Sequence, residues 1–285
     1  MNLNELYKQA YYKNKYGMIL CGDCVQIMKQ MDDACIDLTV TSPPYDNLRT
    51  YNGYCFDFEN VAKELYRVTK NGGVVVWVVG DATIKGSETG TSFRQALYFM
   101  ECGFNLHDTM IYQKNGTGAC GSNKCYWQTF EYMFVFSKGK IKTVNRLTTE
   151  TTVKQGGSRI KSNGEKKKEN RISDNEKKSV RSNVWVYNVG NANNDDKTGH
   201  PAVFPEQLAK DHIISWSNPN EIVFDPFMGS GTTAKMAMLN NRKFIGCEIS
   251  EEYCNIIKDR LNNVQYCDVC GQLLDWELDE SSKEE

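Results

Sequence analysis

The sequence lacks the features that would place it in a membrane or outside the cell. No apolar run approaches the roughly 20 residues that a membrane span needs. The N-terminal stretch is polar and mixed in charge, unlike a secretory signal. The 11 cysteines are odd in number and lie within apolar segments, which argues against a disulfide framework. We therefore expect a soluble, cytoplasmic protein with reduced thiols.

A complete metal-binding motif is also missing. Cys267 and Cys270 are spaced like half of a zinc knuckle. Zinc usually takes four protein ligands at a structural site, and no partner pair is evident for these two. We therefore predict no resident metal and keep Cys267 and Cys270 as the only candidates.

The two signs of charge nearly balance overall, but positive charge is concentrated locally. The formal net charge is -2, which by itself says nothing about nucleic acid. The stretch from Lys138 to Arg181, however, is dense in lysine and arginine. It is either a phosphate-contacting surface or a solvated loop, and the sequence leaves both readings open.

Strand-like and helix-like segments alternate from Met18 to Asn262. This pattern predicts an α/β fold with a mostly parallel sheet covered by helices on both sides. It fails between Gly139 and about Ser182, where glycine and charged runs are typical of loops. We expect strands at 18–21, 36–40, 74–80, 109–112, 131–136, 184–189, 221–225 and 243–248. We expect helices at 24–31, 58–70 (stopped by Asn-Gly-Gly), 92–102, 205–217, 231–240 and 250–263, the last with Ser250 as its N-cap.

A glycine-rich loop joins a strand to a helix in EIVFDPFMGSGTTAKM. A Gly-x-Gly turn lets the backbone approach a ligand closely. The following strand ends in Glu248, and an acid placed about 20 residues after such a loop can bind both hydroxyls of a ribose. A phosphate-binding P-loop is excluded because Gly231 is not followed by Lys-Ser/Thr, and a dinucleotide motif lacks its third glycine. The loop residues are Asp225, Pro226, Phe227, Gly229, Ser230, Gly231 and Thr232.

A second loop, TSPPY, leaves the strand at 36–40 and carries acceptors suited to an amino group. Ser42 offers a hydroxyl and Pro43 a carbonyl, and together they could hold the two hydrogens of an exocyclic NH2. That would free the nitrogen lone pair, which is normally delocalised into the base ring. Pro44 stiffens the loop and Tyr45 offers a ring for stacking on the base. The alternative is that the double proline has a purely structural role as a rigid turn at the end of the strand.

The string DPFMGSGT resembles the first motif of amino-directed DNA methyltransferases, and TSPPY placed before it resembles the beta group of that family. The resemblance spans about Met18 to Asn262. It implies a Rossmann-like, mostly parallel seven-stranded sheet with circularly permuted motif order, and S-adenosyl-L-methionine as cofactor. Cys21-Gly22-Asp23 resembles the family's adenine-contacting motif, and HPAVFP resembles its motif beside the methionine moiety. The implied cofactor-binding set is Asp23, Thr41, His200, Pro201, Phe204, Asp225, Pro226, Phe227, Gly229, Ser230, Gly231, Thr232 and Glu248.

The resemblance also implies an organisation and partners. We expect a catalytic part at 1–140, a basic and partly flexible target-recognition insertion at 141–198, a cofactor-binding part at 199–266 and an acidic tail at 267–285. The expected partner is double-stranded DNA, with the target base flipped out of the stack. Whether a restriction endonuclease accompanies the chain, and whether it acts as a monomer or a homodimer, is left open.

The target atom follows from the first residue of the catalytic loop. Ser-Pro-Pro-Tyr resembles the signature of N4-cytosine enzymes, whereas Asp-Pro-Pro-Tyr is typical of N6-adenine enzymes, so we expect cytosine N4 with adenine N6 as the alternative. A protein-amide or RNA methyltransferase is a further alternative, although amide enzymes normally have Asn first and the cofactor motif earlier. A non-enzymatic DNA-binding module is the last.

Overall fold

The computed structural model describes residues 3–44, 56–115, 126–150, 158–160, 163, 165–168, 178–188, 205–266 and 273–274. The chain divides into two compact units. The larger unit comprises Met1–Asn145 and Asn183–Glu285, and the smaller unit comprises Arg146–Ser182. The smaller unit falls inside the predicted insertion at 141–198, and its role in target recognition stays a prediction.

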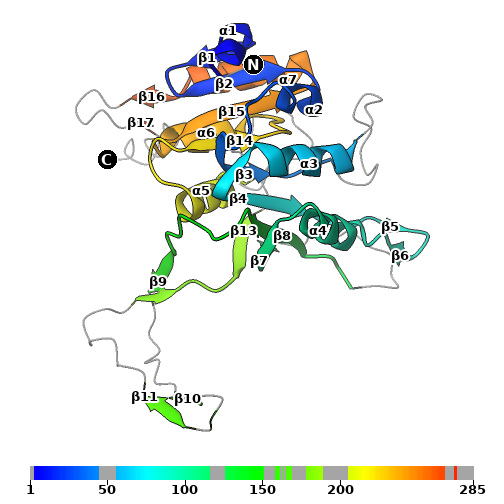
Figure 1. Ribbon diagram of the computed structural model, residues 1–285, viewed down its shortest axis with the longest axis vertical. Helices are drawn as coiled ribbons and strands as arrows, with labels where there is room; N and C mark the ends of the chain where they lie inside the picture. Colours follow the sequence, from blue (N-terminus) through cyan, green and yellow to red (C-terminus); the bar gives the residue numbers. More distant parts are fainter. Residues whose placement is uncertain are drawn as a thin grey trace, which may run out of the picture. The chain divides into compact units, whose positions relative to one another are not determined.

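The larger unit is built on one sheet with the strand order β1-β2-β15-β14-β3-β4-β8-β7-β13 (Figure 1). The strands from β2 to β4 in this order are parallel, β8 is antiparallel to both β4 and β7, and β13 runs parallel to β7. The bounds are β1 Tyr12–Asn14, β2 Gly17–Cys21, β3 Ile36–Thr41, β4 Thr69–Val79, β7 Asn105–Asn115, β8 Phe130–Ser137, β13 Val184–Asn188, β14 Ile222–Asp225 and β15 Lys243–Glu248.

All the predicted strands are present, and the sheet is mostly parallel as expected. Among the described residues it has nine strands instead of seven, because β1 and β13 add one strand at each edge. The strand β1 could not be read from the sequence: it has three residues, Tyr-Lys-Asn, and no apolar alternation.

Helices cover both faces of the sheet. Their bounds are α1 Leu3–Gln9, α2 Cys24–Met28, α3 Phe58–Val68, α4 Thr91–Glu101, α5 Glu206–Trp216, α6 Thr232–Leu239 and α7 Glu251–Asn262. The crossover from β14 to β15 and the crossover from β2 to β3 run in opposite directions along the sheet, so right-handed connections place α6 and α2 on opposite faces. Helix α3 packs between α2 and α4, and α6 packs between α5 and α7 (Figure 1).

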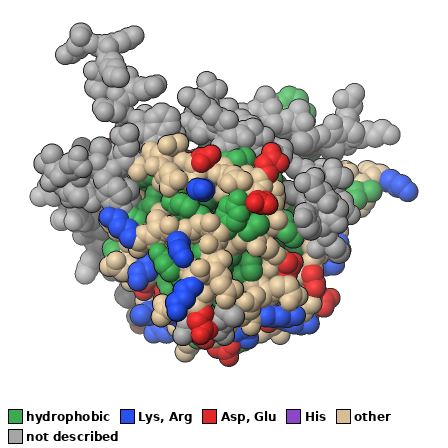
Figure 2. All heavy atoms as spheres, turned by 90° about the horizontal axis from the view of Figure 1, so that it is seen from above, with side chains coloured by type: hydrophobic (Ala, Val, Ile, Leu, Met, Phe, Trp, Pro, Cys, Tyr) green, Lys and Arg blue, Asp and Glu red, His purple; other side chains and the backbone are tan. Residues whose placement is uncertain are grey.

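Every predicted helix is present, and the cap of α7 is confirmed, since Ser250 accepts a hydrogen bond from the Tyr253 N–H. Among the described residues, no helix is long and apolar enough to cross a membrane. The side of the larger unit that carries α1 and β1 mixes lysine, acidic and hydrophobic side chains among those coloured in Figure 2. That mixture is unlike a basic, phosphate-binding surface.

The predicted end of α3 is wrong. The sequence placed the helix at 58–70 with Asn-Gly-Gly as its stop, but α3 ends at Val68 and β4 begins directly at Thr69. The Thr69 hydroxyl donates to the Leu65 carbonyl at 2.6 Å and closes the last turn. Gly72 lies inside the strand at a φ of +84°, where the register against β3 is irregular. A Cβ there would approach the Lys142 Cβ to 2.9 Å, so both the backbone and the space require glycine.

The core lies on both faces of β4. Its residues from Val74 to Val79 are at most 1 % exposed, which confirms a strand covered on both sides. Trp77 is fully buried, and its indole N–H donates to Gln95 Oε1 at 2.8 Å. The buried indole is therefore satisfied, and it packs edge-on against Phe99 on α4.

Thr39, in the middle of β3, offers a test of this core. Within the described part of the chain, its hydroxyl is the one buried side-chain oxygen or nitrogen without a hydrogen-bond partner. Because an unsatisfied buried hydroxyl is costly, Thr39→Val is expected to raise the free energy of unfolding by about 1 kcal/mol. Thermal denaturation should show a gain of about 2–4 °C. The control is Thr41→Val, which removes a bonded hydroxyl two residues along the strand and should lower stability. A Thr39→Val protein no more stable than the parent would contradict this account.

The remaining strands form short antiparallel pairs. In the smaller unit, β9 (Thr148–Glu150) pairs with β12 (Lys178–Val180), and β10 (Ser158–Ile160) pairs with β11 (Lys166–Lys168). The sequence predicted loops here, because these strands are three residues long and polar. In the larger unit, β5 (Thr83–Ile84) pairs with β6 (Ser87–Glu88), and β16 (Gln265–Tyr266) pairs with β17 (Leu273–Leu274). Cys267 and Cys270 lie outside the described residues.

Candidate cofactor and catalytic site

The predicted site residues meet at the carboxyl ends of four neighbouring parallel strands. Strands β2, β15, β14 and β3 lie side by side, so the residues that follow each of them reach the same edge of the sheet (Figure 1). This edge carries Asp23, Thr41, Ser42, Asp225 and Glu248. Both motif loops therefore leave the sheet at one edge, the carboxyl ends of parallel strands, where ligands bind in open α/β sheets. Tyr45, His200, Pro201 and Phe204 lie outside the described residues.

Asp225 ties the cofactor loop to the catalytic loop. Its Oδ1 accepts the Thr41 hydroxyl at 2.6 Å and the Phe227 N–H at 3.0 Å. Thr41 immediately precedes Ser42, so the start of the TSPPY loop is bonded directly to the start of the DPFMGSGT loop. Asp225 is 4 % exposed, and burial raises the pKa of its carboxyl group to about 6, although the hydrogen bonds from Thr41 and Phe227 oppose the rise.

This raised pKa predicts a pH dependence of stability. The folded state binds the Asp225 proton more tightly than the unfolded chain, whose pKa is near 3.8, so stability from this group falls as pH rises from about 4 to about 6. A difference of about two pKa units corresponds to about 3 kcal/mol lost by pH 7. Urea denaturation of the cofactor-free protein between pH 4 and 7.5 should show this loss, and Asp225→Asn should remove it. Parallel pH profiles for the two proteins would contradict the assignment.

Glu248 holds the glycine loop from the neighbouring strand. Its Oε2 accepts the Gly229 N–H at 2.8 Å and its Oε1 accepts the Ser250 N–H at 2.9 Å. Burial raises the pKa of Glu248, and the Ser250 and Gly229 N–H groups oppose the rise. Each carboxylate oxygen has a second lone pair, so two ligand hydroxyls can still be accepted.

The glycine loop turns in the way that the sequence predicted. Gly231 has a φ of +88° and forms the N-cap of α6, and its N–H donates to the Met228 carbonyl at 2.9 Å. A Cβ at this position would lie 3.0 Å from Ile257 Cγ2 on α7. The glycine therefore serves both the left-handed backbone and the close approach of α7.

An ion-pair network behind this loop was missed by the sequence reasoning. Arg260 on α7 donates to the Ser230 carbonyl and hydroxyl, each at 3.1 Å, and to the Thr232 hydroxyl at 3.2 Å. It also pairs with Glu206, the first residue of α5, and Glu206 pairs with Lys235 of α6 at 3.0 Å. A signal existed: Lys235 is the one charged residue in the otherwise uncharged helix TTAKMAML, and its side chain is only 3 % exposed. A lysine so placed needs a buried partner.

Asp23 follows β2, with Gly22 N–H bonded to the Glu248 carbonyl at 2.8 Å. Its Oδ1 accepts the Gln26 N–H at 2.9 Å and caps α2. The capping role is therefore present, and the Asp23 side chain is exposed.

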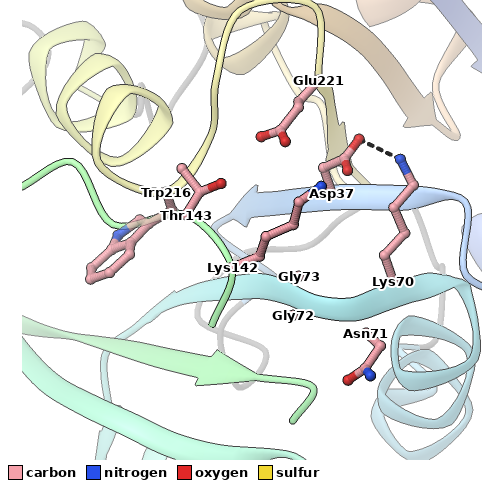
Figure 3. Close-up of a pocket in the computed structure, with 9 residues that line it drawn as sticks. All are labelled: Asp37, Lys70, Asn71, Gly72, Gly73, Lys142, Thr143, Trp216 and Glu221. Carbon is pink, nitrogen blue, oxygen red and sulfur yellow. Dashed lines mark hydrogen bonds and ion pairs between the residues drawn. The ribbon is translucent and has the colours of Figure 1, made fainter. Parts of the chain in front are cut away.

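A pocket lies at the opposite edge of the sheet and is lined by Asp37, Lys70, Asn71, Gly72, Gly73, Lys142, Thr143, Trp216 and Glu221 (Figure 3). It sits where β3 and β14 begin. Asp37 Oδ2 pairs with the Lys70 ammonium at 2.7 Å and accepts the Ile222 N–H at 3.0 Å, so this oxygen makes two structural bonds. The motif residues gather at the other ends of these strands, and this pocket is not the candidate site.

The fold and the two bonded strand-end loops define a Rossmann-like methyltransferase, and comparison with known proteins identifies the family. Residues 36–259 match the N6/N4 family described as DNA methylase. The chain is 59 % identical to the orphan methyltransferase M.BamHII of Bacillus amyloliquefaciens, over 82 % of this chain and 92 % of the relative. The chain belongs to the N6/N4 DNA methylase family, whose members use S-adenosylmethionine, and it is a DNA methyltransferase.

More distant relatives and solved structures agree with this placement. The chain is 28 % identical to the DNA adenine methyltransferase YhdJ of Escherichia coli K12, over 88 % of this chain and 84 % of that protein. The solved PvuII DNA methyltransferase, named as cytosine-N4-specific, matches with a TM-score of 0.67 at 21 % identity, covering 90 % of each chain. An M1.HpyAVI–SAM complex matches with a TM-score of 0.60 at 24 % identity, covering 86 % of this chain and all of that one. These structural matches confirm the fold.

Proposed function

We propose that the chain transfers a methyl group from S-adenosylmethionine to N4 of cytosine at specific sites in duplex DNA. The observation that carries this proposal is the 2.6 Å bond between Thr41 and Asp225, which joins the Ser-Pro-Pro loop to the glycine loop on adjacent parallel strands. A donor held by one loop and an amino group held by the other would then be neighbours. Positioning of this kind supplies much of the rate in a direct transfer.

The glycine loop and the residues beside it fit the proposed cofactor. Glu248 keeps free lone pairs for two ribose hydroxyls, and the turn from Gly229 to Gly231 brings backbone close to a ligand. Asp23 is assigned to the adenine, and the HPAVFP segment with His200, Pro201 and Phe204 to the methionine moiety. The bound cofactor supplies a methyl group on a sulfonium, which is already an activated electrophile.

The residues of the catalytic loop would act on the amino group. The Ser42 hydroxyl and the Pro43 carbonyl accept the two amino hydrogens, which favours a tetrahedral nitrogen with an available lone pair. Pro44 keeps the loop stiff, and Tyr45 stacks on the base. A paired base buries its amino group, so the target must leave the stack at a cost of a few kcal/mol.

Cytosine is favoured by Ser42 at the first position of the loop, and adenine N6 remains the second candidate because YhdJ is a relative of that kind. The basic smaller unit is assigned to DNA recognition. The name of M.BamHII, an orphan methyltransferase, supports action without a dedicated restriction endonuclease.

Single-molecule methylome sequencing of cells that express the protein tests the proposal. We expect N4-methylcytosine at one sequence motif, absent from cells that express Ser42→Ala. Mass spectrometry of the DNA nucleosides provides an independent assignment of the base. N6-methyladenine at the motif would replace the cytosine assignment, and unmodified DNA would overturn the proposal.

A further inference from the structure

Exposed aromatic side chains stand immediately before β8. Tyr126 is 97 % exposed and Trp127 is 57 % exposed, and Phe130, the first residue of the strand, is 45 % exposed. Large rings normally gain by burial, so consecutive exposed ones suggest a surface that is covered during function.

The register of the sheet places these rings at the edge of the sheet that carries Ser42, Asp225 and Glu248. Thr41 in β3 pairs with Trp77 in β4, so Ser42 is level with Val78, and Val78 pairs with Met133 in β8. Phe130 precedes Met133 by three residues in an antiparallel strand, so it lies beyond Ser42 in the direction of this edge. Two strand spacings sideways (about 10 Å) and three residue rises outward (about 10 Å) put Phe130 about 14 Å from Ser42. Tyr126 and Trp127 come earlier still in the chain.

The segment that carries the rings is held in place. The Gln128 side chain donates to Glu88 Oε1 on β6 at 2.7 Å, and the Thr129 carbonyl accepts the Lys114 N–H at 2.7 Å. Lys114 pairs with Glu131 at 2.7 Å, and Tyr132 lies under Phe130 with ring centroids 5.4 Å apart. Bonds at Gln128 and Thr129 thus hold the chain between Trp127 and Phe130.

A separation of about 14 Å is too long for Phe130 to stack on a base seated at Ser42, and Trp127 precedes Phe130 by three residues on the side away from the sheet. Rings at this distance can instead contact the duplex from which the base has come. A flipped base stays joined to its strand, so the gap that it leaves lies about one nucleotide from the flipped base. The exposed rings of Tyr126, Trp127 and Phe130 are therefore covered by the opened duplex. This step rests on the proposed function.

We propose that Trp127, with Tyr126 beside it, stacks on the base pair bordering the gap left by the flipped nucleotide. An aromatic ring in this place offsets part of the stacking lost when the target base leaves the helix. It would act as a positioning residue that favours the flipped state, and it would not touch the reacting atoms.

The test compares Trp127→Ala, Trp127→Phe and Tyr126→Ala with the parent in single-turnover methylation. The substrates are two duplexes carrying the site mapped by the methylome, one fully paired and one with the target base mismatched. Trp127→Ala should lose roughly 5- to 100-fold in rate on the paired duplex, given the usual worth of base–aromatic stacking. It should recover most of that loss on the mismatch, whose target base is already unpaired, and Trp127→Phe should keep most of the activity. Fluorescence of 2-aminopurine beside the target base should rise less with Trp127→Ala.

Tyr7→Ala is the matched control, because Tyr7 is an exposed aromatic on α1 at the opposite end of the strand order, and it should match the parent on both duplexes. Equal activity of Trp127→Ala and the parent on paired DNA overturns the inference. A loss of rate that is equal on both duplexes also overturns it. The same holds for a loss that is explained by a change of oligomeric state. If the parent itself transfers no methyl group to either duplex, the proposed function has failed instead.

Discussion

Replacing Ser42 by alanine is expected to lower the rate of methyl transfer by about 100- to 1000-fold, the usual effect of removing one preorganised hydrogen-bonding group at a reacting centre. The reason is that the amino nitrogen keeps its lone pair in the base ring unless acceptors hold its hydrogens. The cofactor dissociation constant should change by no more than about twofold, because the effect falls on the transition state and not on cofactor binding. Single-turnover kinetics and calorimetric titration measure the two quantities separately.

The matched variant is Ser42→Asp, which keeps an acceptor at the same place. It should retain part of the activity that Ser42→Ala loses, and its preference between cytosine and adenine substrates reports on how this position selects the base. A Ser42→Ala enzyme with full activity would remove the hydroxyl from the mechanism.

Replacing Glu206 by alanine is expected to cause the largest loss of stability. Lys235 is 3 % exposed, and its buried ammonium group would lose the Glu206 carboxylate. Breaking a buried pair in this way costs about 3–5 kcal/mol, which urea denaturation would detect. Arg260 would lose the same partner, and with it the restraint on Ser230 and Thr232, so cofactor affinity should fall as well.

Two further variants separate charge from packing. Glu206→Gln keeps hydrogen bonding without charge and should fall between the parent and Glu206→Ala. The double variant Glu206→Ala/Lys235→Met removes both members of the pair and should recover stability relative to Glu206→Ala, because no lysine is left uncompensated. A Glu206→Ala protein within about 1 kcal/mol of the parent would show that Lys235 finds another partner or gains access to water.

The contrast between Asp225 and Arg260 shows which parts of the site a sequence can reveal. Asp225 lies in a contiguous string, at the end of an apolar strand and before a Gly-x-Gly turn, so its place at a strand end follows from local pattern. Arg260 and Glu206 are 54 residues apart, and only the packing of α5 against α6 and of α6 against α7 brings them together. The Thr41–Asp225 bond likewise joins residues 184 positions apart.

The same distinction applies to the fold. The strand at 74–80 was readable as an unbroken apolar run that ends in glycine, and the helix at 250–263 was readable because its apolar residues recur at the helical period. The end of α3 was misread because Asn-Gly-Gly is a strong local stop signal, and here it serves a bulge in β4 instead. The strands β1, β9 and β12 have three residues each, and such short polar segments carry no periodic signal.

The pairing of β9 with β12 has a consequence for how this protein can diversify. Glu150 lies opposite Lys178, and the Arg181 N–H bonds the Leu147 carbonyl at 2.9 Å, so the chain enters and leaves the smaller unit through a closed two-stranded stem. Any segment inserted between Glu150 and Lys178 is attached at the same two strand ends. Segments of different length could therefore replace residues 151–177 without altering the register of any strand in the larger unit.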